Sequence, residues 1–593
     1  MEEQNPIYFL RKILKKQSIT GYMQPVHDEY MSEYPPACNR RVEWLTGFSG
    51  SAGMAVVLQE NAALFTDGRY TLQADIEVDS AFYEKHNSGE LTPEAWIARV
   101  AGKGDVIGYD AKIFTQAMVQ RMQKTLSPKG ITLAPSANLV DSIWEHRPGA
   151  PASPLFIHEI DYSGEESLSK RKRIAEQLKA LGADVGIVTA PDAVCWLLNI
   201  RGRDVENTPL VLATAIIDSQ GHVQLFVAPS RCDAQVRTHL GNDVEICAPN
   251  TLEQKLGQLG KSAKRVQIDP ATAPVWFSQA LAKAGAKLVE AQDLCLLPKA
   301  IKNTVELAGI CSAHIRDGVA VAKLLCWLEG EFYVREVTEL DVSDKLLVFR
   351  TADRMFLEPS FTTIAGSGPH GAIVHYRVTE DTNRVLKKGE LLLLDSGGQY
   401  LDGTTDITRT VAIGEPTREH KDRFTRVLKG HIALATALFP QGTTGSQLDV
   451  LARQYLWQSG LDYDHGTGHG VGCFLGVHEG PQRISKRGGD AVLQPGMILS
   501  NEPGYYKAGA YGIRIENLVA VTRQAHGQGG KDWLGFETIT CAPLDPKLVD
   551  ASLMTPLEKD WFNAYQAWVL SSLSDSLDNH ERQWLATRCA AIR

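Results

Sequence analysis

Four carboxylates lie within or next to apolar, strand-forming runs, and this constrains the fold more than any other feature of the sequence. Asp395 ends a run of four leucines, and Asp406 lies near the facing position on the second strand of the hairpin that residues 389–414 predict. Glu502 follows another apolar run, and Glu516 precedes a further predicted strand. Half-buried carboxylates need partners, and neighbouring ones repel unless a cation lies between them. One such aspartate is usually a turn or cap residue, whereas four together favour a metal site.

A surface ion pair is the alternative explanation for one of these carboxylates. Arg514 precedes Glu516 by two residues, so both side chains would point to the same face of a strand. This pairing would explain Glu516 alone and would leave the other three carboxylates without a partner.

The glycine-rich stretch DHGTGHGVG, residues 464–472, adds His469 to the set. Four carboxylates and one imidazole, without a thiolate, suit Mn²⁺ or Co²⁺ better than a structural zinc site. Five ligands are too many for one catalytic ion, so two ions about 3.5–4 Å apart that share carboxylates fit better. A phosphate-binding loop is the alternative, but it needs Gly-x4-Gly-Lys-Ser/Thr, and the nearest downstream lysine is Lys486. We expect these glycines to let the backbone approach the metal pocket and the substrate.

Composition and breaks in pattern suggest how the chain is divided. Its 593 residues predict three or four domains. Three prolines in residues 147–154 mark the first boundary, and helix–strand alternation typical of an α/β layer follows. Capping boxes at Asn303 and Thr555 open two further segments. We therefore expect domains at residues 1–150, 151–302 and 303–545, with a helical extension at 546–593.

Two features of this organisation leave alternatives open. Residues 194–217 faintly repeat the pattern of residues 42–57, which indicates either a duplicated domain or a coincidence between two strand-turn-strand stretches. Trp561, Tyr565 and Trp568 share one face of the last predicted helix, where they form either core packing or a subunit interface.

The global properties exclude some partners. A net charge of −9 argues against nucleic acid and anionic membranes, which bind basic surfaces. No apolar run approaches the roughly 20 residues that span a bilayer. The ten cysteines are scattered without a CxxC, which favours the reducing cytoplasm.

In order, spacing and context, the five candidate ligands resemble those of the pita-bread dinuclear metallopeptidases. The matching stretches are LLLLDSGGQYLDGTTDITRT, HGTGHGVG, NEPGYY and GIRIENL. VEWLTGFSGSAGMAVV, LFTDGRYTLQA, WLLNIRG and GAIVHYRV are similar to the long, three-domain cytosolic aminopeptidase P (Xaa-Pro aminopeptidase) branch. The resemblance covers nearly the whole chain. It implies an α/β (α+β) fold, with two creatinase-like N-terminal α/β domains, a pita-bread catalytic domain and a C-terminal helical extension.

The resemblance also implies a role for each ligand. Asp406 and Glu516 would bridge two divalent ions, Asp395 would bind one ion, and His469 and Glu502 would bind the other. Mn²⁺ is the expected metal, with Zn²⁺ and Co²⁺ as alternatives. Glu502 would also act as general base and proton carrier.

Four further residues match positions that line or support the family's site. His375 would contact the substrate or its developing oxyanion, and His478 would be a second catalytic histidine lining the same pocket, although either could be a structural histidine. His465 would line the pocket, and Arg514 would hold a ligand carboxylate. His370 departs from the uncharged residue expected at its position and would add a titratable group near the pocket mouth.

The implied activity is removal of an N-terminal residue that precedes proline, by attack of a hydroxide that bridges the two metals. The alternative is a prolidase, which cleaves Xaa-Pro dipeptides. Methionine aminopeptidase lacks the long front half, and metal-free relatives such as creatinase have lost ligands that are all present here. The expected partners are peptides with proline in second position and a second copy of the chain in a homodimer.

Overall fold

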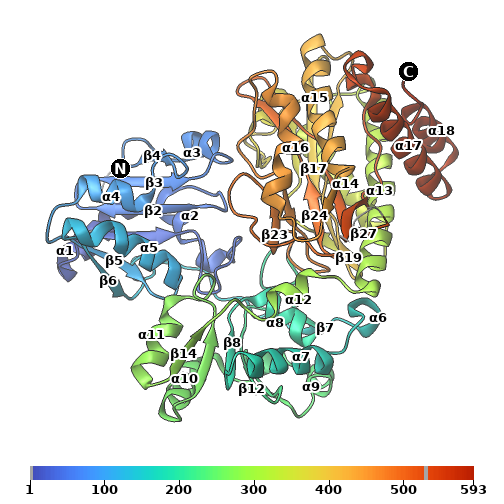
Figure 1. Ribbon diagram of the computed structural model, residues 1–593. Coiled ribbons are helices and arrows are strands. Elements are labelled where there is room, and N and C mark those ends of the chain that lie inside the picture. The colour runs from blue at the N-terminus through green and yellow to red at the C-terminus, as the bar shows by residue number, and fades with distance from the viewer. Residues whose placement is uncertain (1–4, 526–531) are drawn as a thin grey trace. The chain divides into compact units, whose positions relative to one another are not determined.

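The computed structural model describes residues 5–525 and 532–593, and the chain divides into two compact units (Figure 1). The first comprises Met1–His158 and Glu165–Leu296, and the second comprises Glu159–Gly164 and Leu297–Arg593. Across the described residues, no helix is both long and apolar enough to cross a membrane. The boundaries expected within each unit, at residues 150/151 and 545/546, stay predictions.

The first unit contains two six-stranded sheets with the same topology. Their strand orders are β4-β3-β2-β1-β5-β6 and β12-β11-β10-β8-β13-β14. In each, the third and fourth strands pair antiparallel, and the fourth and fifth pair parallel. The faint repeat in the sequence is therefore a structural duplication. The bounds are β1 Gly21–Pro25, β2 Gly53–Leu58, β3 Ala62–Thr66, β4 Glu84–Asn87, β5 Val106–Asp110, β6 Thr132–Ser136, β8 Val185–Val188, β10 Thr214–Asp218, β11 Val223–Phe226, β12 Val244–Cys247, β13 Arg265–Ile268 and β14 Lys287–Glu290.

Amphipathic helices cover these sheets and bury their apolar faces in the cores. Several begin with a side-chain cap, such as Thr92 before α4 and Thr115 before α5, because a hydroxyl accepts from an otherwise unpaired N–H of the first turn. Their bounds are α1 Pro6–Gln17, α4 Pro93–Val100, α5 Gln116–Leu126, α7 Ser167–Ala180, α10 Leu252–Lys261 and α11 Val275–Ala284.

The second unit is built on a three-stranded and a six-stranded antiparallel sheet, with orders β16-β17-β20 and β21-β28-β27-β24-β22-β23. The leucine run of β17 is buried throughout, so both faces of that strand are covered. A separate hairpin, β25-β26, completes the region. The bounds are β16 Ile364–Ser367, β17 Leu391–Ser396, β20 Ile407–Ala412, β21 Leu438–Pro440, β22 Gly468–Gly470, β23 Glu479–Ile484, β24 Ile498–Asn501, β25 Gly504–Lys507, β26 Tyr511–Arg514, β27 Asn517–Gln524 and β28 Trp533–Thr538.

The predicted hairpin is present as the antiparallel pair β17–β20, but its connection is more elaborate than a turn. Asp395 lies opposite Thr408, so Asp406 stands just before β20 and near its predicted facing position. The connecting residues form β18 Gly398–Tyr400 and β19 Gly403–Thr404, which join β15 Phe356–Pro359 in a separate small sheet. The glycines between the two strands, which are typical of a turn, begin this longer connection.

Both predicted capping boxes begin helices of the second unit. Asn303 with Glu306 starts α13, and Thr555 with Glu558 starts α17. The C-terminal α17 and α18, dark red in Figure 1, lie beside α13. The bounds are α13 Thr304–Glu331, α14 Glu339–Thr351, α15 Arg418–Ala435, α16 Gly445–Trp457, α17 Pro556–Leu573 and α18 Asn579–Arg588.

The aromatic stripe on α17 belongs mainly to the core. Tyr565 is buried, and the ring of Trp561 stacks on it with centroids 5.3 Å apart. Trp568 is 36% exposed. Core packing therefore explains the first two rings of the stripe.

Candidate metal centre

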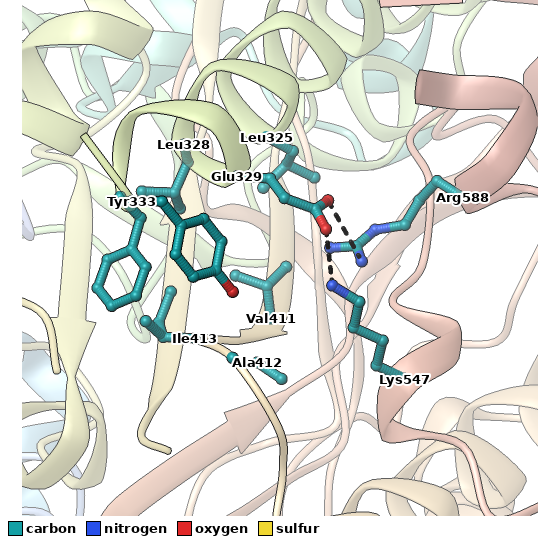
Figure 2. Close-up of a pocket in the computed structure, with 11 residues that line it drawn as sticks. Leu325, Leu328, Glu329, Tyr333, Val411, Ala412, Ile413, Lys547 and Arg588 are labelled. Carbon is teal, nitrogen blue, oxygen red and sulfur yellow. Dashed lines mark hydrogen bonds and ion pairs between the residues drawn. The ribbon is translucent and has the colours of Figure 1, made fainter. Parts of the chain in front are cut away.

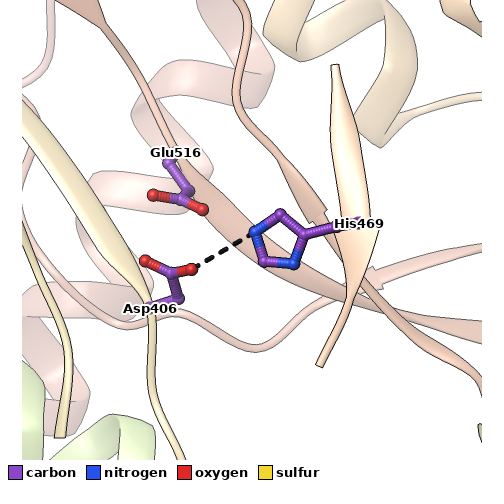
Figure 3. A group of neighbouring side chains, drawn as sticks. All are labelled: Asp406, His469 and Glu516. Carbon is purple, nitrogen blue, oxygen red and sulfur yellow. Dashed lines mark ion pairs between the residues drawn. The ribbon is translucent and has the colours of Figure 1, made fainter. Parts of the chain in front are cut away.

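Three of the predicted ligands converge on one point. Asp406, His469 and Glu516 each offer one ligand atom, and these atoms all lie within 4.8 Å of one another. Figure 3 shows the three side chains pointing toward a common centre; His469 lies in β22, Asp406 just before β20 and Glu516 just before β27. His469 Nε2 is 3.5 Å from Asp406 Oδ2 and 3.5 Å from Glu502 Oε1, so Glu502 borders the same group.

Neighbouring strands bring these residues together. Asn501 and Asn517 are paired at the end of the β24–β27 ladder. Because the strands are antiparallel, Glu502, which follows one asparagine, and Glu516, which precedes the other, leave the ladder at the same end. His469 lies in the middle of the adjacent β22.

The carboxylates are mutually destabilising without a cation. Burial and then the nearby charges of other carboxylates raise the pKa of Asp406 and of Glu516 well above its usual range. The pKa of Glu502 is also raised, with burial as the largest cause and Asp395 as a further one. Such a cluster favours protonation or cation binding.

One atom of the cluster lacks any protein partner. Asp395 Oδ1 is buried and accepts no hydrogen bond within the part of the chain that the structure describes. A buried, unsatisfied carboxylate oxygen is costly unless an ion or water completes it. Together with the raised carboxylate pKa values, this shows that the residues present fit divalent cations.

The ring of His469 is oriented for ligation. Its Nδ1 lies 2.9 Å from Gly470 O, so Nδ1–H donates there and Nε2 keeps a lone pair facing the carboxylates. His478 packs edge-on against this ring, with centroids 4.4 Å apart, which places the second predicted histidine beside the cluster.

Arg514 connects Asp395 to His465 through a tyrosine. The guanidinium donates to Asp395 Oδ2 at 2.5 Å and to Tyr506 Oη at 2.6 Å. His465 Nδ1–H donates to Gly466 O at 2.7 Å, so its Nε2 accepts from Tyr506 at 2.8 Å. Arg514 is buried at 1% exposure, and the surface pair with Glu516 that the sequence left open is therefore wrong.

His375 and His370 occupy different environments. His375 lies in a turn, and the preceding carbonyl, of Val374, accepts from Arg514 at 3.3 Å, which places the histidine next to the cluster's support. His370 is anchored by a buried carboxylate, and its expected place near the pocket mouth stays a prediction. Its Nδ1 lies 2.9 Å from a carboxylate oxygen of the fully buried Glu339, to which Tyr376 also donates.

The glycines around His469 lie against neighbouring strands. A Cβ on Gly468 would collide with the carbonyl of Ser500, and one on Gly470 with the carbonyl of Glu479. The strands therefore approach closely at these glycines, and the expected approach of the backbone to a substrate stays a prediction. His469 lies in β22 and His465 in the bend that precedes it, so these two histidines do not share a helix.

Three hydroxyl groups that hydrogen-bond to the candidate ligands or to Arg514 were not predicted from the sequence. Thr408 donates to Glu516 Oε2 at 2.8 Å, and Ser500 donates to Glu502 Oε1 at 3.0 Å. Tyr506 links Arg514 to His465 as described above. Thr408 and Ser500 each lie two residues from a ligand, and alternation along a strand places such residues on the ligand's face. That spacing of two residues could have predicted Thr408 and Ser500 from the sequence.

Comparison with known proteins identifies the family. Residues 308–523 match metallopeptidase family M24, residues 8–143 and 146–306 each match the creatinase/prolidase N-terminal domain, and residues 532–592 match the C-terminal region of the M24 peptidases. Aminopeptidase P2 of Arabidopsis thaliana is 40% identical over 96% of this chain and 85% of that protein. The chain belongs to the Xaa-Pro aminopeptidase P family. A second member, the probable Xaa-Pro aminopeptidase P of Coprinopsis cinerea, is also 40% identical and covers 98% of this chain and 97% of that one.

Solved structures place this Xaa-Pro aminopeptidase P family member closer to aminopeptidases than to prolidases. The X-prolyl aminopeptidase of Caenorhabditis elegans, described as a cytosolic enzyme with a di-nuclear active site, superposes with a TM-score of 0.95 at 33% identity over 99% of both chains. The Xaa-Pro dipeptidase of Bacillus anthracis gives a TM-score of 0.52 at 25% identity and covers 64% of this chain and 99% of its own. The predicted fold, two creatinase-like domains before an M24 catalytic domain, is confirmed.

Proposed function

We propose that this protein is a metal-dependent aminopeptidase that hydrolyses the peptide bond between an N-terminal residue and a following proline. The observation that carries this proposal is the buried cluster of four carboxylates and one imidazole within a chain that matches Xaa-Pro aminopeptidases P along its length. Five ligands are too many for one catalytic ion with an open position, and two divalent cations that share carboxylates would use them all.

The cluster's geometry supports a specific division of the ligands. Asp406 and Glu516 lie at its centre and would contact both ions. Asp395, whose Oδ1 has no hydrogen-bond donor among the residues that the structure describes, would hold one ion, and His469 with Glu502 would hold the other. Mn²⁺ suits this oxygen-rich donor set, with Zn²⁺ and Co²⁺ as alternatives. When bound, the two ions supply Lewis-acid polarisation of the scissile carbonyl and lower the pKa of a water molecule toward neutrality.

The protein's own residues would move protons and bind the substrate. Ser500 fixes one oxygen of Glu502, and the other lies 3.9 Å from His465, free to take a proton and pass it to the leaving nitrogen. His375 and His478, beside the cluster, would donate hydrogen bonds to the developing oxyanion. The nitrogen of the proline peptide bond carries no N–H, so the proline side must be recognised through apolar contact.

Three further properties are proposed for the whole protein. We expect the domain boundaries near residues 150, 302 and 545; the first two lie close to the ends of the family matches, whereas 545 lies within the match to the C-terminal region. We expect a cytoplasmic location, in line with the C. elegans enzyme. We also expect a homodimer, which a mass measurement in solution at several concentrations tests directly.

Metal exchange with three substrates tests the activity. The purified protein is stripped with a chelator, then restored separately with Mn²⁺, Co²⁺ or Zn²⁺, and assayed on an Xaa-Pro-Xaa tripeptide, an Xaa-Pro dipeptide and a Met-Ala peptide. We expect cleavage of the tripeptide that disappears on stripping and returns best with Mn²⁺. Cleavage of the dipeptide alone would identify a prolidase, and turnover by the stripped protein would reject the metal-dependent mechanism.

A further inference from the structure

The C-terminal extension contacts the catalytic region in two places, one near the surface and one buried. At the surface, beside the pocket in Figure 2, Glu329 of α13 forms an ion pair with Lys547 at 2.7 Å and lies 4.0 Å from Arg588. Trp584 of α18 also donates to Glu329, at 2.8 Å. These contacts hold the extension against α13. The buried contact is made by Tyr565 of α17.

The hydroxyl of Tyr565 reaches a group of backbone carbonyls behind the metal centre. It accepts from an Arg409 guanidinium nitrogen at 2.8 Å. It also lies 2.9 Å from the carbonyl oxygens of Thr540 and Ala542, to one of which its proton is donated. Burial raises the pKa of Tyr565 to about 12, so the hydroxyl keeps that proton at neutral pH.

Arg409 is a buried cation that depends entirely on hydrogen bonds. It lies on β20, three residues after Asp406, and is 1% exposed. Within the described residues no carboxylate pairs with it; it donates instead to carbonyl oxygens, the amide oxygen of Asn517 and Tyr565. A buried charge of this kind is costly if one partner is lost. The five N–H groups of Arg409 face six acceptors, and Tyr565 Oη is one of the three around Nη2, with Asn517 Oδ1 and Ala542 O.

The backbone of Glu516 relies on this arginine. Glu516 lies between β26 and β27, outside any strand. Its N–H donates to Thr408 O at 3.2 Å, and its carbonyl accepts from Arg409 at 2.6 Å. The backbone of Glu516 is thus held by one hydrogen bond to the backbone of β20 and one from the side chain of Arg409.

A second branch leads to Glu502. Asn517 Nδ2 donates to His431 Nε2 at 3.1 Å, so Nδ1–H of that ring donates to Asn501 O at 3.1 Å. Burial lowers the pKa of His431 to about 3, which keeps the ring neutral and able to accept. Asn501 immediately precedes Glu502. One network therefore runs from the extension to the residues adjoining two predicted ligands.

We propose that Tyr565 is a positioning residue of the metal centre, acting through Arg409, Asn517 and His431 on the backbone at Glu516 and Glu502. The inference rests on the proposed metal-dependent function. It gives the C-terminal extension a role in metal binding that is independent of any subunit contact.

Tyr565→Phe in the full-length protein removes the hydroxyl and keeps the ring that stacks on Trp561. The dissociation constant for Mn²⁺ is measured by calorimetry on chelator-stripped protein, together with kcat and KM for an Xaa-Pro-Xaa tripeptide. We expect Mn²⁺ affinity to fall by about 10-fold or more, as is typical when a group supporting metal ligands is removed. The lost kcat should return as Mn²⁺ is raised, with KM within about twofold of wild type, because the substrate contacts are untouched.

Tyr83→Phe is the matched control. Tyr83 is buried in the first unit and donates to Leu45 O at 3.1 Å, so its loss tests a missing buried hydroxyl away from the metal centre. We expect its Mn²⁺ affinity to equal that of the wild type. His431→Gln probes the network from its other end and should weaken Mn²⁺ binding as Tyr565→Phe does.

Wild-type Mn²⁺ affinity in Tyr565→Phe, whatever its melting temperature, would overturn the inference. A uniform loss of thermal stability without a change in affinity would show a purely structural residue and would overturn it equally. If the wild-type protein binds Mn²⁺ but leaves the tripeptide intact, only the proposed function fails, and the comparison of affinities still decides the role of Tyr565.

Discussion

At the scale of single residues, the candidate metal centre is held by partners that differ from one ligand to the next. Asp395 has a guanidinium, while Glu516 and Glu502 each have one hydroxyl. Of these three carboxylates, only Asp395 accepts a hydrogen bond from a cationic side chain. The remaining acidic ligands keep raised pKa values, which is the condition that a divalent cation relieves.

A histidine away from the cluster gives a prediction for pH dependence. His314 of α13 is fully buried, its Nε2 has no partner in the described residues, and burial lowers its pKa from 6.5 to about 4. Below pH about 6.5, this histidine is protonated in the unfolded chain but stays neutral in the folded one. The free energy of unfolding therefore falls by about 1.4 kcal/mol per pH unit, down to the pKa of the folded state. This contribution is fully present above the unfolded pKa.

His314→Leu removes that sensitivity to acid. We expect its melting temperature, relative to the wild type, to rise steadily as the pH falls from about 7 to about 5. Melting curves of both proteins across this range measure the difference. A constant difference at every pH would mean that His314 titrates alike in the folded and unfolded chains.

At the scale of elements, a buried ion pair fixes the strands that carry two ligands. Arg350 of α14 forms two hydrogen bonds to Asp317 of α13, at 2.6 and 3.0 Å, and also donates to Ser396, which follows Asp395. Asp317 accepts from Thr405, which precedes Asp406, at 2.6 Å. The helices thereby set the spacing of the β17–β20 pair at the metal centre.

Asp317→Asn should destabilise the protein strongly. Removing one partner leaves the guanidinium buried without a countercharge, which typically costs about 3–5 kcal/mol. Thermal melting should show a clear decrease for this variant. Asp344→Asn, at an exposed position on α14, is the control and should melt like the wild type. Equal melting temperatures for the two variants would contradict the assigned role of the pair.

Local patterns in the sequence predicted the elements well, and contacts between distant segments poorly. The leucine run, the capping boxes at Asn303 and Thr555, and the paired strands β17 and β20 follow from periodicity and turn chemistry, which depend on neighbouring residues. The connection through β18 and β19 does not follow from local patterns, because β18 pairs with β15, a strand about forty residues earlier in the chain.

The same distinction applies to the site. The sequence identified the candidate carboxylate ligands because a carboxylate within or next to an apolar run is unusual, whichever way its side chain points. It did not identify the partners of His370 and Arg409, since Glu339 and Tyr565 lie 31 and 156 residues away along the chain. Likewise, the neighbours of Gly468 are set by strand pairing, which the glycine pattern alone does not specify.

At the scale of the whole molecule, two duplicated α/β domains precede a catalytic region whose last helices extend back toward the metal centre. This length distinguishes the chain from the B. anthracis dipeptidase, which corresponds to 64% of it. We therefore propose that the catalytic region holds the metals and that the C-terminal extension provides part of their support.

Metal content per chain tests the central claim most directly. The wild type and Asp406→Asn are loaded with Mn²⁺, freed of excess ion and analysed for bound metal, with circular dichroism as the check on folding. We predict about two ions per wild-type chain and at most about one in Asp406→Asn, because the lost carboxylate would contact both. We also predict that Asp406→Asn abolishes tripeptide cleavage and keeps the wild-type spectrum. Full wild-type activity without bound metal, or near-normal turnover by Asp406→Asn, would contradict the account.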